Sequence, residues 1–333
     1  MLSDSIVVNL NKAPDTKASI KQIYKKIEIV PLDNAEGDYS SSLSTLSVTK
    51  DRFYLKSGDS MIVSYTHNGR IVDSLRPGSV VTDYYIFKDS VLDLLAGKEF
   101  LSFSLPDYTL QQRIPLVTQV TLTKIAREDE NVVCFSGYKD VNDYTCKYYC
   151  DKQYLSEAPG STTSTNIKRI EEEVHYFSYC DHLYKLFPHS GCIWECGDFT
   201  YQFFNPTFRL KNGRVKFCSA QITDSKIYYR LLLGNEEYLL ILNRADRSVS
   251  MLLNGEEREL IFHEAEKKYL LLNKCREGVY LPLGVMRDGI NYFCCPAADL
   301  PRYLTNDLLD SKNATTMDIA QKNNDYVVIK YYL

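Results

Sequence analysis

The chain has 333 residues, of which 44% are hydrophobic and 25% are charged, a balance that excludes a disordered protein and allows a large core. Its formal net charge is −4, and its Lys and Arg residues are scattered singly. This excludes nucleic acid as the main partner, because phosphate binding needs a clustered basic face. No apolar stretch reaches the roughly 20 residues of a membrane-spanning helix.

Tyrosine and cysteine are both frequent, with 26 Tyr against one Trp and with ten Cys. Tyrosine suits half-buried strands and wet recognition surfaces alike, so its excess alone does not choose between them. Several cysteines, such as Cys134 in NVVCF and Cys218 in VKFCSA, stand among apolar strand residues. A thiol in such surroundings acts as a small hydrophobic side chain.

Residues 1–22 are interpreted as an N-terminal extension, and residues 23–333 as a single domain. The chain opens with MLSDSIVVNL, which looks like a mature start behind an added Met rather than a signal peptide. We therefore expect an export signal to have been removed.

A short phrase recurs six times: an apolar run, one basic or small residue, Asp or Asn, and then an alternating strand-like run. Asp and Asn tolerate turn backbone and bond their own chain, so each copy predicts the tip of a β-hairpin. Six such hairpins along one chain predict a radially repeated all-β fold. The tips are Lys50-Asp51, Lys88-Asp89, Glu128-Asp129, Cys180-Asp181, Lys211-Asn212 and Arg287-Asp288.

A second apolar hairpin follows the first five tips. Two hairpins in each repeat make a four-stranded meander, which is a propeller blade. The expected second turns lie at Asn68-Gly69, at Pro106-Asp107, near Asp151, near Gly197-Asp198 and around residues 244–246. The long interval before the sixth tip is expected to hold an extra strand or loop, including residues 263–275.

The last repeat lacks a fourth strand of its own. A helix-like stretch at 298–312 precedes a final strand at 325–333, and a spare strand stands at 23–32. Because proteins avoid exposed sheet edges, these two strands are expected to pair. The sequence thus predicts an all-β fold, a six-bladed β-propeller whose ring is closed by pairing of the N-terminal and C-terminal strands in the last blade. A pair of β-sandwiches is the alternative.

The chain resembles a family of six-bladed propellers that is abundant in Bacteroides and its relatives, commonly as exported lipoproteins. The resemblance is carried by IYKKIEIVPLDN, VSYTHNGRIVDSL, LYKLFPHSGCIWEC and NNDYVVIKYYL, at 23–34, 63–75, 183–196 and 323–333. The family's Gly- and Pro-rich loop is reduced here to RPGSVVTDYY at 76–85. The resemblance implies a propeller at the cell envelope, periplasmic or on the surface, that touches the membrane only through a removed lipid-anchor signal. It implies no established reaction.

No catalytic residue, metal ligand or cofactor is predicted. The residues at 180–196 include Cys and His at spacings that resemble a zinc site. If 192–196 is a strand, however, Cys192 and Cys196 are about 13 Å apart, too far to bind one zinc ion. The sequence has no nucleophile elbow and no phosphate-cradling glycine loop. A metal-assisted lactonase, lyase or glycan-active hydrolase that uses oxygen ligands in the central channel remains the alternative function.

The preferred function is a non-catalytic binding or scaffold module. In propellers the loops that lead from an outer strand to the next inner strand usually form the binding face, which selects 76–85, 117–127, 160–174 and 203–208. The expected ligand is a glycan, a peptide or a partner protein at the mouth of the central channel. The candidate ligand-binding residues are Arg76, Asp83, Tyr84, Arg127 and Asn205.

Overall fold

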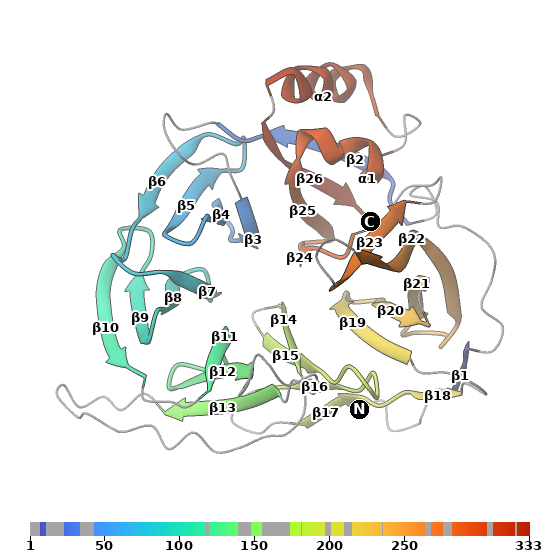
Figure 1. The fold of residues 1–333 in the computed structure, drawn as a ribbon, viewed down its shortest axis with the longest axis horizontal. Coiled ribbons are helices and arrows are strands. Elements are labelled where there is room, and N and C mark those ends of the chain that lie inside the picture. Colours follow the sequence, from blue (N-terminus) through green and yellow to red (C-terminus); the bar gives the residue numbers. More distant parts are fainter. Residues whose placement is uncertain are drawn as a thin grey trace. The chain divides into compact units, whose positions relative to one another are not determined.

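The computed structural model describes residues 7–10, 23–33, 43–116, 120–138, 148–154, 174–180, 182–196, 201–209, 215–234, 236–263, 268–275, 282–304, 309–323 and 325–333. The fold is all-β with short helices near the C-terminus, and its strands are arranged as in a β-propeller (Figure 1). The chain divides into two compact units. The first unit comprises Met1–Ile29, Pro188–Ile193 and Gln202–Leu333, and the second unit comprises Val30–Phe187 and Trp194–Tyr201.

Three sheets lie wholly in the second unit, and each is a meander whose strands follow chain order. The first consists of β3 (Leu43–Val48), β4 (Arg52–Ser57), β5 (Met61–Thr66) and β6 (Ile71–Leu75). The second consists of β7 (Val81–Phe87), β8 (Val91–Ala96), β9 (Glu99–Ser104) and β10 (Thr109–Pro115). The third has three described strands, β11 (Thr121–Arg127), β12 (Val132–Tyr138) and β13 (Tyr148–Tyr154).

Two further sheets are meanders of four and five strands. One consists of β14 (His175–Tyr179), β15 (His182–Leu186), β16 (Ile193–Glu195) and β17 (Tyr201–Phe204). The other consists of β19 (Val215–Ile222), β20 (Lys226–Leu233), β21 (Glu236–Asn243), β22 (Val249–His263) and β23 (Lys268–Cys275). The fifth strand of this sheet explains the long interval before the last tip and confirms the extra strand expected around 263–275.

The C-terminal sheet has the order β2-β26-β25-β24. Its strands are β2 (Lys26–Pro31), β24 (Val285–Arg287), β25 (Ile290–Pro296) and β26 (Tyr326–Tyr332). A 3₁₀ turn (Ala297–Asp299), helix α1 (Leu300–Tyr303) and helix α2 (Ser311–Asn323) connect β25 to β26. A separate parallel pair joins β1 (Val7–Asn9) to β18 (Thr207–Arg209).

The expected pairing of the two ends of the chain is confirmed. Strand β2 lies beside β26, and the Lys25 N–H donates to the Tyr332 carbonyl at 2.8 Å. The Tyr332 hydroxyl also donates to Glu28 at 2.6 Å. In the described residues five sheets have the four or more strands of a complete blade, and the sheet β11–β13 has three. Six complete blades and a closed ring therefore stay predictions.

Most of the expected tips are turns between the first and second strands of a sheet. At the second, fourth and sixth tips the backbone is left-handed, with φ of 47° at Lys88, 56° at Asp89, 49° at Cys180 and 50° at Asp288. Lys211-Asn212 lies outside the described residues. In that sheet the turn between the first two strands falls instead at 223–226, where the Thr223 side chain accepts the Lys226 N–H.

One expectation is wrong, and another is confirmed only in part. No turn exists at Asp151, because β13 runs straight through it and Asp151 lies opposite Phe135 of β12. The helix-like stretch expected at 298–312 is confirmed in part: the 3₁₀ turn (Ala297–Asp299) and α1 lie at its start, whereas the longest helix, α2, begins only at Ser311 and runs to Asn323. Helix α2 buries little more than Asn313 and Ala320, so it lacks the apolar stripe that would have predicted it. The turn expected near Gly197-Asp198 lies outside the described residues.

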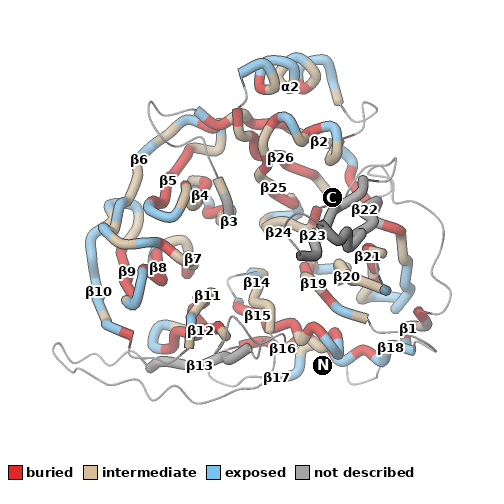
Figure 2. The backbone as a smooth tube through the Cα atoms, viewed as in Figure 1, coloured by how far each residue is buried: buried red, intermediate tan, exposed pale blue. Residues whose placement is uncertain are grey.

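The core of the second unit lies between neighbouring sheets. Apolar side chains of β4 and β5 pack against those of β7, β8 and β9, and a further cluster joins β8 and β9 to β11 and β12. Figure 2 shows β8 mainly buried and β10 mainly exposed. The middle strands of these sheets are therefore largely buried, although they also carry buried polar groups such as Asp93 of β8.

Candidate functional site

The first strands β3, β7 and β11 share a β-bulge at an equivalent position. In β3, Ser44 pairs with Lys56 and Leu46 with Leu55, so no residue of β4 lies directly opposite Thr45. The residue that the strand register skips in the same way is Thr82 in β7 and Thr123 in β11. A bulge bends the strand and re-aims the extra side chain. In the second unit three threonines thus occupy one repeated position.

The first strand of a sheet in the first unit carries the same irregularity. In β19, Phe217 pairs with Leu231 and Ser219 with Arg230, so the strand register skips Cys218 and places it at a bulge. The bulge therefore recurs in four first strands, whereas β14 and β24 pair with their second strands without a register shift. It is threonine in three copies and cysteine in the fourth.

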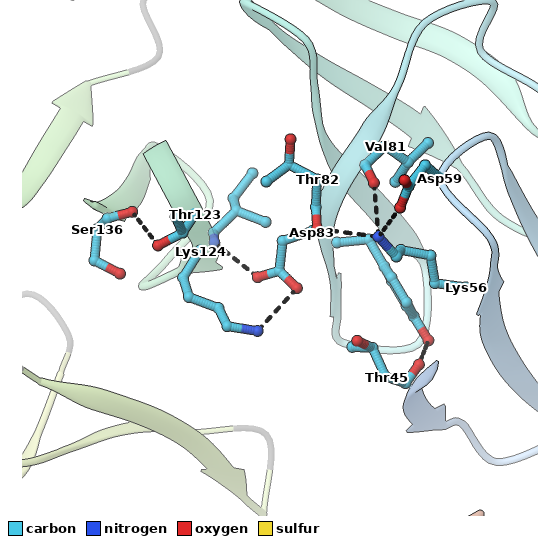
Figure 3. A network of polar contacts seen from close by, with 11 residues as sticks. Thr45, Lys56, Asp59, Val81, Thr82, Asp83, Thr123, Lys124 and Ser136 are labelled. Atoms are coloured by element: carbon cyan, nitrogen blue, oxygen red, sulfur yellow. Dashed lines mark hydrogen bonds and ion pairs between the residues drawn. The ribbon is translucent and has the colours of Figure 1, made fainter. Parts of the chain in front are cut away.

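The residues that follow the bulge in β7 and β11 form an ion pair. Asp83 and Lys124 stand at equivalent positions of their strands, and Lys124 Nζ lies 3.4 Å from Asp83 Oδ1. Figure 3 shows the Lys124 side chain reaching back from β11 toward Asp83. The Lys124 side chain is 61% exposed and the Asp83 side chain only 6%. The ammonium group is therefore open to solvent and the carboxylate is held in the protein.

Asp83 also fixes the backbone of β11. Its Oδ2 accepts the Ile125 N–H at 3.0 Å. Burial raises the pKa of Asp83 above its ordinary value, although Lys124 and the Ile125 N–H both work in the opposite direction. A carboxylate in this position is costly to charge without Lys124, so the pair acts as one unit.

A lysine of the preceding sheet holds the bulge of β7. Lys56 Nζ donates to the Val81 carbonyl at 2.9 Å and lies 3.5 Å from the Thr82 carbonyl, and it also contacts Asp59 at 3.2 Å (Figure 3). These carbonyls belong to the residue before the bulge and to the bulge itself. Two neighbouring sheets thus hold the bulge of β7: Lys56 of β4 binds its backbone carbonyls, and the Ile125 N–H of β11 binds the Asp83 side chain that follows it.

An aromatic residue lies two positions beyond Asp83 on β7. Tyr85 shares the face of Asp83 by strand alternation, and its hydroxyl lies 2.8 Å from the Ser178 hydroxyl of β14. The half-buried ring packs against a cluster formed by Ala126, Leu183 and Cys196. The Asp83–Lys124 pair is therefore followed along the strands by an apolar surface.

The residues expected from the sequence do not gather into one site. Arg76 is exposed in the connection from β6 to β7. Tyr84 is buried, and its hydroxyl lies 2.6 Å from the carbonyl oxygens of both Thr45 and Tyr54, so it joins two sheets. Asn205 belongs to the first unit, where it is exposed and accepts the Cys192 thiol at 3.0 Å. Of the five, only Asp83 lies in the bulge site.

Arg127 is buried in an ion pair between two sheets. Its Nε lies 2.6 Å from Asp93 Oδ2 and its Nη2 lies 2.8 Å from Asp93 Oδ1, with exposed side-chain fractions of 5% and 0%. A third donor, Nη1, reaches the Glu130 carbonyl at 3.0 Å. These contacts give Arg127 a place in the packing of β8 against β11.

The zinc-like cluster is divided between the two units. His189 and Cys192 belong to the first unit, whereas Cys180, His182 and Cys196 belong to the second. His182 Nδ1 lies 2.8 Å from Glu195 Oε1, and Cys196 is buried. Asp181 lies outside the described residues. Across the described part of the chain no three His, Cys, Asp or Glu side chains converge as metal ligands would.

The bulge residues were missed by the sequence analysis, although a weak signal exists. Each lies six or seven residues before the Asp of its hairpin turn, at Asp51, Asp89, Asp129 and Asp224. A search for a small polar residue at that spacing would have found Thr45, Thr82 and Thr123. Nothing in one strand, however, marks which residue will be left without a partner on the next.

The solved structures similar to this chain are distant in sequence. A crystal structure of a protein from Bacteroides fragilis NCTC 9343, described as exported, matches over 97% of this chain and 98% of its own, with 9% identity and a TM-score of 0.62. A catalytically inactive virginiamycin B lyase from Staphylococcus aureus with quinupristin matches over 74% of this chain and 88% of its own, with 10% identity and a TM-score of 0.40. At such identities the first likeness shows a shared fold alone.

No protein-family model matches the sequence, and no curated protein does so either. Among the described helices none is both long and apolar enough to cross a membrane.

Proposed function

We propose that the protein is a binding or scaffold module of the bacterial cell envelope, and that it holds a polar ligand on its first strands. The observation that carries this is the repeated bulge, which sets Thr45, Thr82 and Thr123 at one position in three successive sheets. A bulge interrupts the pairing of two strands, and bulges are frequent beside active sites. We therefore infer that the repeated bulge serves ligand binding. The exposed ammonium of Lys124 adds a charged donor to the same row.

The envelope location and the lipoprotein anchor are parts of this proposal. Two observations support them: the resemblance of the sequence to exported propellers of Bacteroides relatives, and the fold shared with a protein described as exported. The proposal also takes the sheet β11–β13 as the sixth blade, with the ligand at the mouth of a central channel. The metal-assisted enzyme has no set of ligands among the described residues that favours it.

The test is a binding measurement on an array that carries oligosaccharides beside peptides. We expect the wild-type protein to bind one of these classes, and T82V/T123V, which removes two hydroxyls at nearly constant volume, to weaken that binding at least tenfold. T315V, on α2 in the first unit, is the matched control. Binding that T82V/T123V leaves unchanged, with the variant folded, would show that the first strands do not hold the ligand.

A further inference from the structure

The row of polar groups on β7 and β11 carries no net charge at its centre. Asp83 and Lys124 neutralise each other at 3.4 Å, and neither of the two threonines beside them is ionisable. An anionic ligand placed on Lys124 would also meet the Asp83 carboxylate, and a cationic ligand on Asp83 would meet the Lys124 ammonium. Such a repulsive partner discriminates against both kinds of charge. The arrangement therefore favours a neutral ligand.

The Asp83–Lys124 pair and the two threonines still have hydrogen-bond donors and acceptors that a ligand could use. Lys124 has three N–H donors and uses one of them on Asp83. A carboxylate offers about four acceptor positions, of which Lys124 and the N–H groups of Ile125 and Tyr84 use three. A threonine hydroxyl both donates and accepts, and that of Thr123 already donates to the Ser136 carbonyl at 3.4 Å (Figure 3). A ligand hydroxyl group also does both. Of two neighbouring ligand hydroxyls, one can thus donate to Asp83 while the other accepts from Lys124.

An apolar surface stands next to this polar pair. On β7, Tyr85 lies two residues beyond Asp83, and on β11, Ala126 lies two residues beyond Lys124, about 7 Å along each strand. The Tyr85 ring packs against the cluster that contains Ala126, and its hydroxyl is held by Ser178. A ring fixed in this way offers an apolar surface at little entropic cost. Polar groups at one end and an apolar ring at the other match a molecule with hydroxyl edges and C–H faces.

We propose that Asp83, Lys124 and Tyr85, flanked by Thr82 and Thr123, form a subsite for a neutral sugar ring. Two adjacent sugar hydroxyls bind the Asp83–Lys124 pair, and the C–H face of the ring lies toward Tyr85. This inference rests on the proposed function, because it names the ligand class of the same first-strand surface. Small-molecule sites commonly combine apolar and aromatic side chains with a few polar or charged groups that fix the orientation of the ligand.

The experiment compares neutral hexose disaccharides with matched disaccharides that contain glucuronic acid, by calorimetric titration of the whole protein. We expect the neutral sugars to bind, and their affinity to change less than about twofold between low salt and high salt, because no net charge is screened. K124M is expected to weaken binding at least tenfold, and K98A, an exposed lysine in the turn between β8 and β9, to leave it unchanged. D83N and Y85L should also weaken it.

The outcomes separate this inference from the proposed function. Preferential binding of the acidic sugars, with strong salt dependence and loss in K124M, overturns the neutral-sugar subsite and leaves a ligand site on the first strands. Failure of every sugar overturns the subsite as well, and peptides then decide the proposed function. Sugar binding that neither K124M nor T82V/T123V weakens overturns both. Because K124M and D83N both disturb the ion pair, the uncharged exchange T82V/T123V decides the question where either of them unfolds.

Discussion

At the residue scale, the clearest contrast in the second unit is between two arginine–carboxylate pairs of similar geometry. Arg127 and Asp93 are buried between sheets. Arg113 pairs with Glu99 at 3.0 and 2.8 Å, but its side chain is 62% exposed. Distances alone would rate the two pairs as equals. Their surroundings make one a structural requirement of the packing and the other a surface feature.

We expect R127M to lower the free energy of unfolding by about 3–5 kcal/mol, because it leaves the buried Asp93 charge without its partner. R113M, the matched control, should cost no more than about 1 kcal/mol, since exposed pairs are weak. Urea denaturation followed by tryptophan or tyrosine fluorescence measures both. The double variant R127M/D93L should recover most of the loss, because neither charge of this pair then remains buried. Equal costs for R127M and R113M would contradict a structural role for Arg127.

At the scale of elements, helix α2 protects the free edge of β2. Asn313 accepts the Ile29 N–H at 2.9 Å and donates to the Ile27 carbonyl at 3.1 Å, which are the backbone groups that an edge strand leaves without a partner. Asp310 starts the helix by accepting the Asn313 N–H at 2.8 Å. The Asn313 side chain therefore satisfies two backbone groups of β2 that would otherwise need a neighbouring strand.

N313A is expected to destabilise the protein by at least about 2 kcal/mol, since each of two buried backbone groups loses its partner at about 1–3 kcal/mol. N323A, at the exposed end of the same helix, makes the same chemical change outside that contact and should be nearly neutral. Chemical denaturation compares the two variants. If they unfold at the same denaturant concentration, the edge of β2 does not depend on Asn313.

The elements also show what the sequence could and could not predict. Tips such as Lys88-Asp89 were found because their backbone chemistry is local and needs no knowledge of the partner strand. The bulges were not found, because Thr82 is unpaired only through the register of β7 on β8. Asp83 was chosen as a ligand residue from its loop, whereas its ion pair depends on a strand 41 residues away. Helix α2 gave a weak signal, since few of its residues contact the core: Asn313 and Ala320 are buried and Met317 is partly buried.

At the scale of the whole molecule, the sheet that joins the chain's two ends is the most consequential pairing. Strand β2 covers β26, and Tyr24, Ile27 and Ile29 complete a core cluster with Val327, Ile329 and Tyr331. The Glu28 carboxylate ties the strands further, because Tyr332 and Lys330 both reach it. Burial by itself would raise the pKa of Glu28, but these partners outweigh it and lower the pKa below its ordinary value.

Because β2 is separate in sequence from the rest of its sheet, it can be supplied in trans. A chain that begins at residue 34 should expose the edge of β26 and the apolar cluster, and we expect it to aggregate or to lose its cooperative unfolding transition. A synthetic peptide of residues 1–33 should restore a soluble, cooperatively folded protein, since it returns the backbone hydrogen bonds and the buried side chains of both β1 and β2. The same peptide with Ile27 and Ile29 replaced by Asp is the control, and it should fail because its charges would enter the core. A shortened chain that unfolds like the full one would show that β2 does not complete this sheet.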